Sequence, residues 1–284
     1  MFNALVLNHL PKKYLTCLSE KAVKNLSRPP DLTTIAELLI ASEIEKAEAW
    51  KTVDRMRRLA EDTSCAMSAK RIHFVDYWSE HFPQRLRELD KNPWGLYFMG
   101  NLPSNAPSLA VVGTRNPNQY GLEVLNKILG RMSTNQFEHI SGLAYGVDAI
   151  AHQITLKLGV RNFAVLGSGI DMLYPAENIE LAQAILDAGG GILSEFPPGT
   201  AAQPWHFPWR NRIIAGLADV VWIPQGSKKS GSAHTAIWAE QIGRQIVTTP
   251  GDIFSELSAL PHELLDYESV KTILKSQDLE AFLT

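Results

Sequence analysis

The stretch Ser141-Gly-Leu-Ala-Tyr-Gly-Val-Asp-Ala-Ile-Ala-His152 joins a short apolar run with the pattern of a strand to a run with helical spacing. Its serine and two glycines allow the backbone to approach a ligand closely, and the helix that follows would aim unpaired N–H groups at the same place. This arrangement is typical of an anion site, most often a phosphate site. A second turn of this kind at Gly113 makes nucleotide or nucleic-acid binding the leading hypothesis.

Outward from this stretch, short apolar runs alternate with helical patterns. The expected strands cover residues 109–112, 137–141, 162–166, 192–196, 219–223 and 245–249. The expected helices cover residues 121–132, 147–158, 178–188, 210–217 and 232–242. Apolar strands separated by helices predict an α/β fold with a doubly wound, mostly parallel sheet that is covered on both faces.

The whole chain is expected to consist of three parts. Residues 1–75 are expected to form a small helical domain, because residues 32–59 are rich in Ala, Leu, Glu and Lys. Residues 76–252 hold the α/β core, and residues 253–284 are expected to add a short acidic extension with one or two helices.

Composition limits the class of protein. No apolar run reaches the roughly 18–20 residues of a membrane span, and the N-terminus meets Pro11-Lys-Lys13 without the basic start of a secretory signal. The two cysteines, Cys17 and Cys65, lack a Cys-x-x-Cys spacing and indicate reduced thiols in a cytoplasmic protein. No cluster of His, Cys and Asp residues has the spacing of metal ligands. We therefore expect neither a membrane protein nor a metal site.

The net charge of −3 argues against a broadly basic surface that coats nucleic acid. The acidic excess lies after residue 252, and the middle of the chain is nearly neutral. A site for a polyanion must then be a focused pocket, in which single arginines matter.

The glycine turns at residues 113, 142, 167 and 226 each follow an expected strand. They should meet at the carboxyl edge of the sheet, where such folds bind ligands. Arg115 would project over this edge, and its planar fork suits phosphate. The alternative is a surface arginine in a structural turn.

Asp148 and His152 lie four residues apart, on the same face of the expected helix. Asp148 is expected to cap this helix, because a carboxylate would repel phosphate. The alternatives are that it hydrogen-bonds a ligand hydroxyl or orders the pocket. Ser141 could complete a hydrolase triad with both, but the Gly-x-Ser-x-Gly elbow is absent and so close a set would be unusual.

The segment from Phe207 to Arg212 combines aromatic rings with two arginines that flank Asn211. Aromatic rings offer stacking faces for unpaired bases, and arginines hold phosphates. The alternative is that the rings pack a helix end and one arginine pairs with Glu195 or Asp219. We expect one arginine to be structural and the other to lie at the site.

The loop from residue 225 to residue 232 places glycines, serines, Lys228 and Lys229 before a helix, which again suits an anion. It is not a P-loop, since Gly-Lys-Ser/Thr is absent. The alternative is a solvated, mobile loop. No Gly-x-Gly-x-x-Gly follows the first strand, so no dinucleotide cofactor is expected.

Ordered motifs across residues 76–252 resemble the DprA/Smf family of DNA-processing proteins. They are Gly113-Thr-Arg115, Tyr120-Gly121, Ser141-Gly-Leu-Ala-Tyr-Gly-Val-Asp148 with Ala151-His152, Val165-Leu-Gly-Ser-Gly169, Tyr174-Pro175, Asn178, Leu193-Ser-Glu-Phe-Pro-Pro-Gly-Thr200, Phe207-Pro208, Arg210-Asn-Arg-Ile-Ile-Ala-Gly-Leu217, Ser230-Gly-Ser232, Thr235-Ala236 and Pro250-Gly251.

This resemblance implies an extended Rossmann-like core that binds single-stranded DNA, protects incoming strands during natural transformation and helps to load the RecA recombinase. It also implies a homodimer, with neither catalysis nor a cofactor. The residues expected to contact nucleic acid are Gly113, Thr114, Arg115, Ser141, Gly142, Gly146, Gly167, Arg210, Asn211, Arg212, Lys228, Lys229, Ser230 and Gly231.

The sequence departs from the family pattern in three places. Pro224-Gln-Gly226 stands where Glu-Ala is usual, the Gly-x-Asn-x-Leu-Ile segment after Pro250-Gly251 is missing, and no winged-helix domain follows before Thr284. These departures bear on the dimer surface and partner contacts, and leave open a role in a mobile element or in defence. The alternative function is a nucleotide-binding sensor or a phosphoribohydrolase-like enzyme on the same fold, with Asp148 or Glu195 as the acid.

Overall fold

The computed structural model of the chain describes residues 1–9, 26, 28–133 and 136–283. Cys17, the segment Pro11-Lys-Lys13 and Thr284 lie outside this part of the chain, whereas Cys65 is an exposed free thiol. None of the helices in the described ranges combines the length and the hydropathy needed to cross a bilayer.

The described residues form one nine-stranded sheet in the order β1-β2-β6-β5-β4-β3-β7-β8-β9. The strands are β1 (His73–Asp76), β2 (Gly95–Gly100), β3 (Ser108–Val111), β4 (Glu138–Ser141), β5 (Arg161–Leu166), β6 (Gly191–Ser194), β7 (Val220–Ile223), β8 (Gln245–Thr248) and β9 (Lys271–Thr272). All pairings from β6 to β9 are parallel, so the expected parallel sheet is confirmed and its six expected strands are β3 to β8.

Three strands extend the sheet beyond this expectation. β2 pairs antiparallel with both β1 and β6, and β9 pairs parallel with β8 at the other edge. The long connection from β1 to β2 contains a 3₁₀ turn rather than a two-residue hairpin, and β9 has only two residues. Neither the β1–β2 pair nor β9 therefore shows the turn signal or the alternating pattern by which strands are recognised in a sequence.

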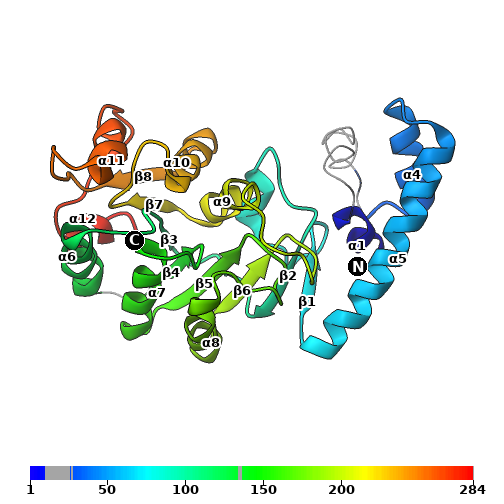
Figure 1. Cartoon of the computed structure of the whole chain (residues 1–284), viewed down its shortest axis with the longest axis horizontal. Coiled ribbons are helices and arrows are strands. Elements are labelled where there is room, and N and C mark those ends of the chain that lie inside the picture. Colours follow the sequence, from blue (N-terminus) through cyan, green and yellow to red (C-terminus); the bar gives the residue numbers. More distant parts are fainter. Residues whose placement is uncertain (10–25, 27, 134–135, 284) are drawn as a thin grey trace.

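Helices cover both faces of the sheet, as expected of a doubly wound fold (Figure 1). The helices are α1 (Phe2–Asn8), α4 (Leu32–Ala41), α5 (Lys46–Lys70), α6 (Gln119–Ile128), α7 (Val147–Lys157), α8 (Ile179–Asp187), α9 (His206–Leu217), α10 (Gly231–Gln241), α11 (Ala259–Leu264) and α12 (Ser276–Glu280). Short 3₁₀ turns are η1 (Gln84–Glu88), η2 (Leu129–Arg131), η3 (Ala176–Asn178) and η4 (Glu256–Ser258).

The alternation of side chains along β3 separates the two layers. Leu109 and Val111 pack with residues of α6 and α7, whereas Ala110 and Val112 pack with residues of α9 and α10. Successive side chains of a strand point to opposite faces, so each apolar strand is buried twice. This burial explains why the strands read as continuous apolar runs.

The N-terminal helices form a separate layer beside β1 and β2 (Figure 1). The expected helical run at residues 32–59 is present, but it is divided between α4 and α5, and α5 continues to Lys70. Lys70 Nζ lies 2.6 Å from an Asp171 carboxylate oxygen, and Asn8 Nδ2 donates to the Glu195 carbonyl at 2.9 Å. These contacts attach the helices to the core, and the domain boundaries at residues 75 and 252 stay predictions.

The order of the parallel strands creates a crevice at β3. The chain passes from β3 to β4 on one side, and returns later to place β7 on the other side. The loops after β3 and β7 therefore diverge at the carboxyl edge of the sheet, which is the usual place for a ligand in such folds.

Candidate functional site

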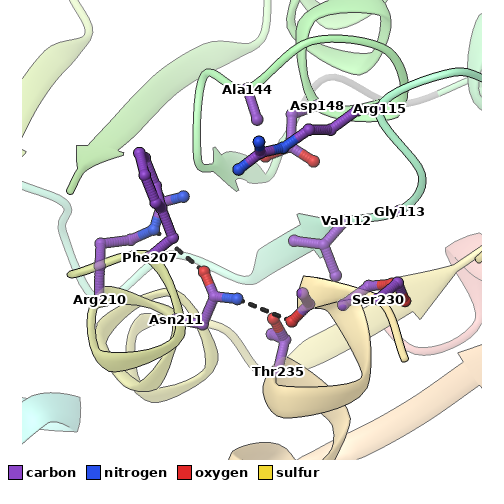
Figure 2. A pocket seen from close by; sticks show the side chains of 12 residues that line it. Val112, Gly113, Arg115, Ala144, Asp148, Phe207, Arg210, Asn211, Ser230 and Thr235 are labelled. Atoms are coloured by element: carbon purple, nitrogen blue, oxygen red, sulfur yellow. Dashed lines mark hydrogen bonds between the residues drawn. The ribbon is translucent and has the colours of Figure 1, made fainter. Parts of the chain in front are cut away.

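A cavity of about 200 Å³ lies at this crevice (Figure 2). Side chains from the loops after β3 and β4, from α7, from α9 and from the start of α10 meet around it. The lining residues are Val112, Gly113, Arg115, Ala144, Asp148, Phe207, Arg210, Asn211, Ser230, Gly231, Ser232 and Thr235. Six of the residues expected from the sequence are among them, namely Gly113, Arg115, Arg210, Asn211, Ser230 and Gly231.

Arg115 is the exposed cation of the cavity. Its guanidinium carbon lies 5.2 Å from the centroid of the Phe207 ring, so one face of the ring meets a positive charge. The turn that carries Arg115 is held by Gln225, whose carbonyl accepts the Thr114 N–H at 2.9 Å. Gln225 is buried, and it belongs to the Pro224-Gln-Gly226 segment that departs from the family pattern.

Gly146 positions the same turn from the other side. Its φ is +72°, and a Cβ there would lie 2.5 Å from the carbonyl oxygens of Thr114 and Arg115. The next residue, Val147, donates its N–H to the Thr114 carbonyl at 3.1 Å. Gly146 and Thr114 therefore hold Arg115 in place, and neither lines the cavity.

Phe207 is half-buried at the start of α9. A Cβ on Gly167 would lie 2.9 Å from its ring, so the glycine at the end of β5 makes room for the aromatic side chain. The neighbouring His206 bonds through Nδ1 to the Gly167 carbonyl at 2.9 Å. Gly167 does not line the cavity, and its contacts support the ring that does.

Arg210 is the buried cation of the cavity, with 4% of its surface exposed. Its Nη1 donates to the carbonyl oxygens of Gly142 and Val165, and its Nε donates to the Asn211 side chain at 3.0 Å. Burial lowers the pKa of Arg210 to about 10, and the charge of Asp148 opposes this shift. Arg210 therefore joins α9 to the ends of β4 and β5 while it brings positive charge to the cavity.

Asp148 does not cap α7, which corrects the expectation from the sequence. Gly146 occupies the N-cap position, and Asp148 accepts the Gly142 N–H at 3.1 Å. Burial raises the pKa of the Asp148 carboxyl, while Arg210 and the backbone N–H groups of the loop act in the opposite direction. The loop thus directs the Gly142 N–H toward the protein's own carboxylate rather than toward a phosphate. Of residues 141–146, only Ala144 lines the cavity, and the nucleic-acid contacts expected at Ser141, Gly142 and Gly146 stay predictions.

Ser141 lies beneath the cavity rather than in it. Its side chain is completely buried, and its hydroxyl donates to the Val111 carbonyl at 2.7 Å. His152 is equally buried and donates through Nδ1 to the Asn162 side chain at 2.8 Å. Burial lowers the pKa of His152 to about 4. Since His152 bonds neither Ser141 nor Asp148 in the structure, the three residues do not form the disfavoured hydrolase triad.

The start of α10, rather than the loop before α7, places a helix N-terminus at the cavity, where it favours an anion. Ser230, Gly231 and Ser232 line the cavity, and the first N–H groups of a helix have no partner within it. Asn211 bridges the two helices, because its Nδ2 donates to the Gly231 carbonyl at 2.9 Å. This helix end lies opposite Arg115 in Figure 2.

Thr235 lines the cavity, although it was not among the residues expected to contact nucleic acid. It follows Gly231 by one helical turn, lines the cavity and is completely buried. Its hydroxyl has no hydrogen-bond partner among the residues that the structure describes. Buried hydroxyls are nearly always bonded, so this group is suited to a ligand in the cavity.

The other basic residues expected at the site lie elsewhere. Arg212 is 1% exposed, pairs with Glu195 and stacks 4.0 Å from the Trp209 ring, which confirms the expected pairing of one arginine with Glu195. Lys228 Nζ lies 3.2 Å from the Glu263 carboxylate, and Lys229 is exposed in the same loop. None of these three cations lines the cavity.

A family model and several similar known proteins all indicate the same family. The family model for DNA recombination-mediator protein A matches residues 73–284. The chain is 32% identical over 252 residues to DNA processing protein DprA of Bacillus subtilis (strain 168), which covers 88% of this chain and 83% of the relative. It is 36% identical over 201 residues to DNA processing protein DprA of Streptococcus pneumoniae, with 70% of each chain covered. It spans a smaller share, 44%, of protein Smf of Synechocystis, at 38% identity.

Two solved structures share the fold. The X-ray structure of DNA processing protein A from Streptococcus pneumoniae matches with a TM-score of 0.82 and 29% identity, covering 99% of this chain and 96% of that one. A structure of DNA processing protein A from Helicobacter pylori matches with a TM-score of 0.63 and 28% identity, covering 75% of this chain and 95% of that one. The second structure was determined to describe single-stranded DNA binding by that protein.

Proposed function

This chain belongs to the DprA/Smf family of DNA recombination-mediator proteins, and we propose that it binds single-stranded DNA at the cavity between β3 and β7. One observation carries the proposal: the exposed Arg115, the buried Arg210, the Phe207 ring and the start of α10 all face a single cavity. This combination provides a phosphate contact, a stacking face and a helix end for an anion. The single-stranded DNA binding of the Helicobacter pylori relative supports the same ligand.

The size and charge of the cavity favour part of a strand as the ligand. Its volume of about 200 Å³ is below the roughly 300–1,000 Å³ of sites that enclose a drug-sized molecule, so it suits one nucleotide of a longer chain. Arg115 would meet a phosphate at the surface, while a base stacks on Phe207. Duplex DNA hides its base faces and would not enter.

We infer a role in recombination without catalysis or cofactor. In this role the protein protects incoming single strands during natural transformation and helps to load RecA, acting as a homodimer in the cytoplasm. The family assignment and the names of the relatives support the DNA-processing part of this role. RecA loading is tested by measuring DNA-dependent ATP hydrolysis by RecA on strands coated with single-strand-binding protein. The wild-type chain should shorten the lag, and Arg115→Ala should not.

Binding itself is tested by fluorescence anisotropy with single strands, duplex and mononucleotides at two salt concentrations. We expect salt-dependent binding of single strands over duplex. Arg115→Ala should weaken it about tenfold and lower the salt slope by about one, because one phosphate contact is lost. The matched control is Arg131→Ala, an exposed arginine in η2 that does not line the cavity. Equal binding by the two variants, or no binding of single strands by the wild type at low salt, contradicts the proposal.

The alternative function on this fold is a nucleotide sensor or a phosphoribohydrolase-like enzyme. One observation favours it: Asp148 lines the cavity, and burial raises the pKa of its carboxyl, as is common for catalytic acids. Glu195, the other acid considered, instead bonds Arg212 and Trp209 and does not line the cavity. Release of free base from nucleoside monophosphates, lost in Asp148→Asn, would support the enzyme; no release rejects it.

A further inference from the structure

The loop after β5 places a second aromatic ring beside the cavity. Tyr174 is 45% exposed, and its ring centroid lies 5.8 Å from that of Phe207, with 49° between the ring planes. Tyr174 does not line the cavity itself. Phe207 therefore has the Arg115 guanidinium and the Tyr174 ring as neighbours, and a row from Arg115 through Phe207 to Tyr174 leads away from the cavity.

The Tyr174 loop is held in place on both sides. Asn178 Nδ2 donates to the Leu143 carbonyl at 2.8 Å, which ties the end of the loop to the segment after β4. Near its start, Asp171 accepts the Gly199 N–H at 2.7 Å and pairs with Lys70. Because these contacts already order the loop, a ligand that stacks on Tyr174 would lose little affinity to ordering it.

An exposed carboxylate on the loop disfavours a phosphate as the contact of Tyr174. Glu177 lies three residues further along, exposed, and accepts a hydrogen bond from the Tyr145 hydroxyl. This bond raises the pKa of Tyr145 to about 12; Tyr174 adds to the shift, and the charge of Arg115 opposes it. A carboxylate in this position repels the sugar–phosphate backbone, whereas it leaves the face of an aromatic ring free to stack.

We propose that Tyr174 is a second stacking subsite, which takes an unpaired base adjacent to the nucleotide held in the cavity. The proposal rests on the proposed binding of single-stranded DNA and adds a position to it. Stacking on an aromatic face tolerates all four bases, because every base has a π-face. The strand would then run from the Arg115 side of the cavity across Phe207 to Tyr174.

The test is the affinity of single-stranded oligonucleotides for the full chain, measured by anisotropy. Tyr174→Ala should bind about tenfold more weakly, since base–aromatic stacking is worth about 1–3 kcal/mol per base. Tyr174→Phe keeps the ring and should bind as the wild type does. The matched control is Met172→Ala, because Met172 lies in the same loop and is also 45% exposed but has no aromatic face. The exposed position of Tyr174 should leave the melting temperature of every variant unchanged.

A second measurement identifies the base. Short oligonucleotides with one abasic site are compared position by position. The wild type should lose affinity when the site falls at the stacked base, and Tyr174→Ala should show no further loss at that position. The salt slope should stay the same in Tyr174→Ala and fall in Arg115→Ala, since only the arginine contacts phosphate.

The outcomes separate the two proposals. If Tyr174→Ala binds like Met172→Ala while Arg115→Ala is impaired, the Tyr174 subsite is rejected and the cavity remains the binding site. If Tyr174→Phe is impaired as much as Tyr174→Ala, the ring does not act by stacking and the subsite is also rejected. If the wild type binds no single-stranded DNA, both proposals fail.

Discussion

The guanidinium of Arg210 lies directly against Gly142, and any side chain at this position would have to displace it or the Asp148 carboxylate. Arg210 Nη1 donates to the Gly142 carbonyl at 2.8 Å, and a Cβ on Gly142 would lie 2.5 Å from Nη2. The same Cβ would lie 2.7 Å from an Asp148 carboxylate oxygen. One residue without a side chain therefore lets a buried cation and a buried acid both bond to the backbone at the end of β4.

Substitution of this glycine should damage the cavity from within. Gly142→Ala must displace the end of Arg210 or of Asp148, and crowding a packed interior costs about 1–3 kcal/mol. We expect this loss in the free energy of unfolding by denaturant titration, together with weaker binding of single-stranded DNA. The control is Gly130→Ala, since a Cβ there would meet its nearest atom at an ordinary 3.7 Å. A Gly142→Ala variant as stable as Gly130→Ala would show that the contact is not tight.

Arg212 should prove structural, although it lies two residues from Arg210. Arg212→Met leaves Glu195 without its buried partner, which typically costs about 3–5 kcal/mol of stability. Because Arg212 does not line the cavity, the salt slope of DNA binding should be unchanged in the folded variant. Adding Glu195→Gln should recover part of the stability in a double-mutant cycle. A lowered salt slope for Arg212→Met would contradict this assignment.

The Thr235 hydroxyl should matter to the ligand more than to the fold. Thr235→Val keeps the shape and removes a buried hydroxyl that has no partner among the described residues. The free energy of unfolding should therefore stay the same or rise, because an unsatisfied buried hydroxyl costs about 1–3 kcal/mol. Affinity for single-stranded DNA should fall severalfold, as one hydrogen bond to the ligand is lost. Destabilisation with unchanged affinity would argue that the hydroxyl bonds within the protein.

Acid should destabilise the chain through its buried histidines. His139 and His152 are completely buried with ring centroids 4.7 Å apart, and burial lowers the pKa of both, that of His152 to about 4. Arg210 also lowers the pKa of His152. The folded chain then binds fewer protons than the unfolded chain. This contribution to stability is complete above pH 6.5 and is lost as the pH falls toward 4, by about 3 kcal/mol for His152.

The measurement is the free energy of unfolding between pH 8 and pH 4. His139→Leu should lose less stability over this range than the wild type, because one buried group no longer has to be protonated. Asp148 acts in the opposite direction, since its raised pKa gives stability below 3.8 that is lost as the pH rises through its folded pKa. A pH profile that is identical in His139→Leu and the wild type would contradict the role of the pair.

Several parts of the fold could be predicted because they depend on local patterns. The six apolar runs became β3 to β8, and the glycines after four of the strands lie at one edge. Arg115 follows the first of these turns and does reach the cavity. The antiparallel pair β1 and β2 could not be predicted from the sequence, because the two strands are separated by some twenty residues and no recognisable turn joins them.

The site, like the fold, has parts that local patterns predict and parts that they do not. The sequence alone determined the α/β order, the edge at which the loops gather and the position of Arg115 at that edge. These follow from periodicity and from glycine at strand ends, which act over a few residues. Only the tertiary structure decided that Asp148 takes the Gly142 N–H, that Arg210 faces the cavity while Arg212 pairs with Glu195, and that Thr235 lines the cavity. Those outcomes depend on which distant segments meet at β3 and β7. A buried charge needs a partner, and the tertiary contacts rather than the local spacing determine which partner is near it.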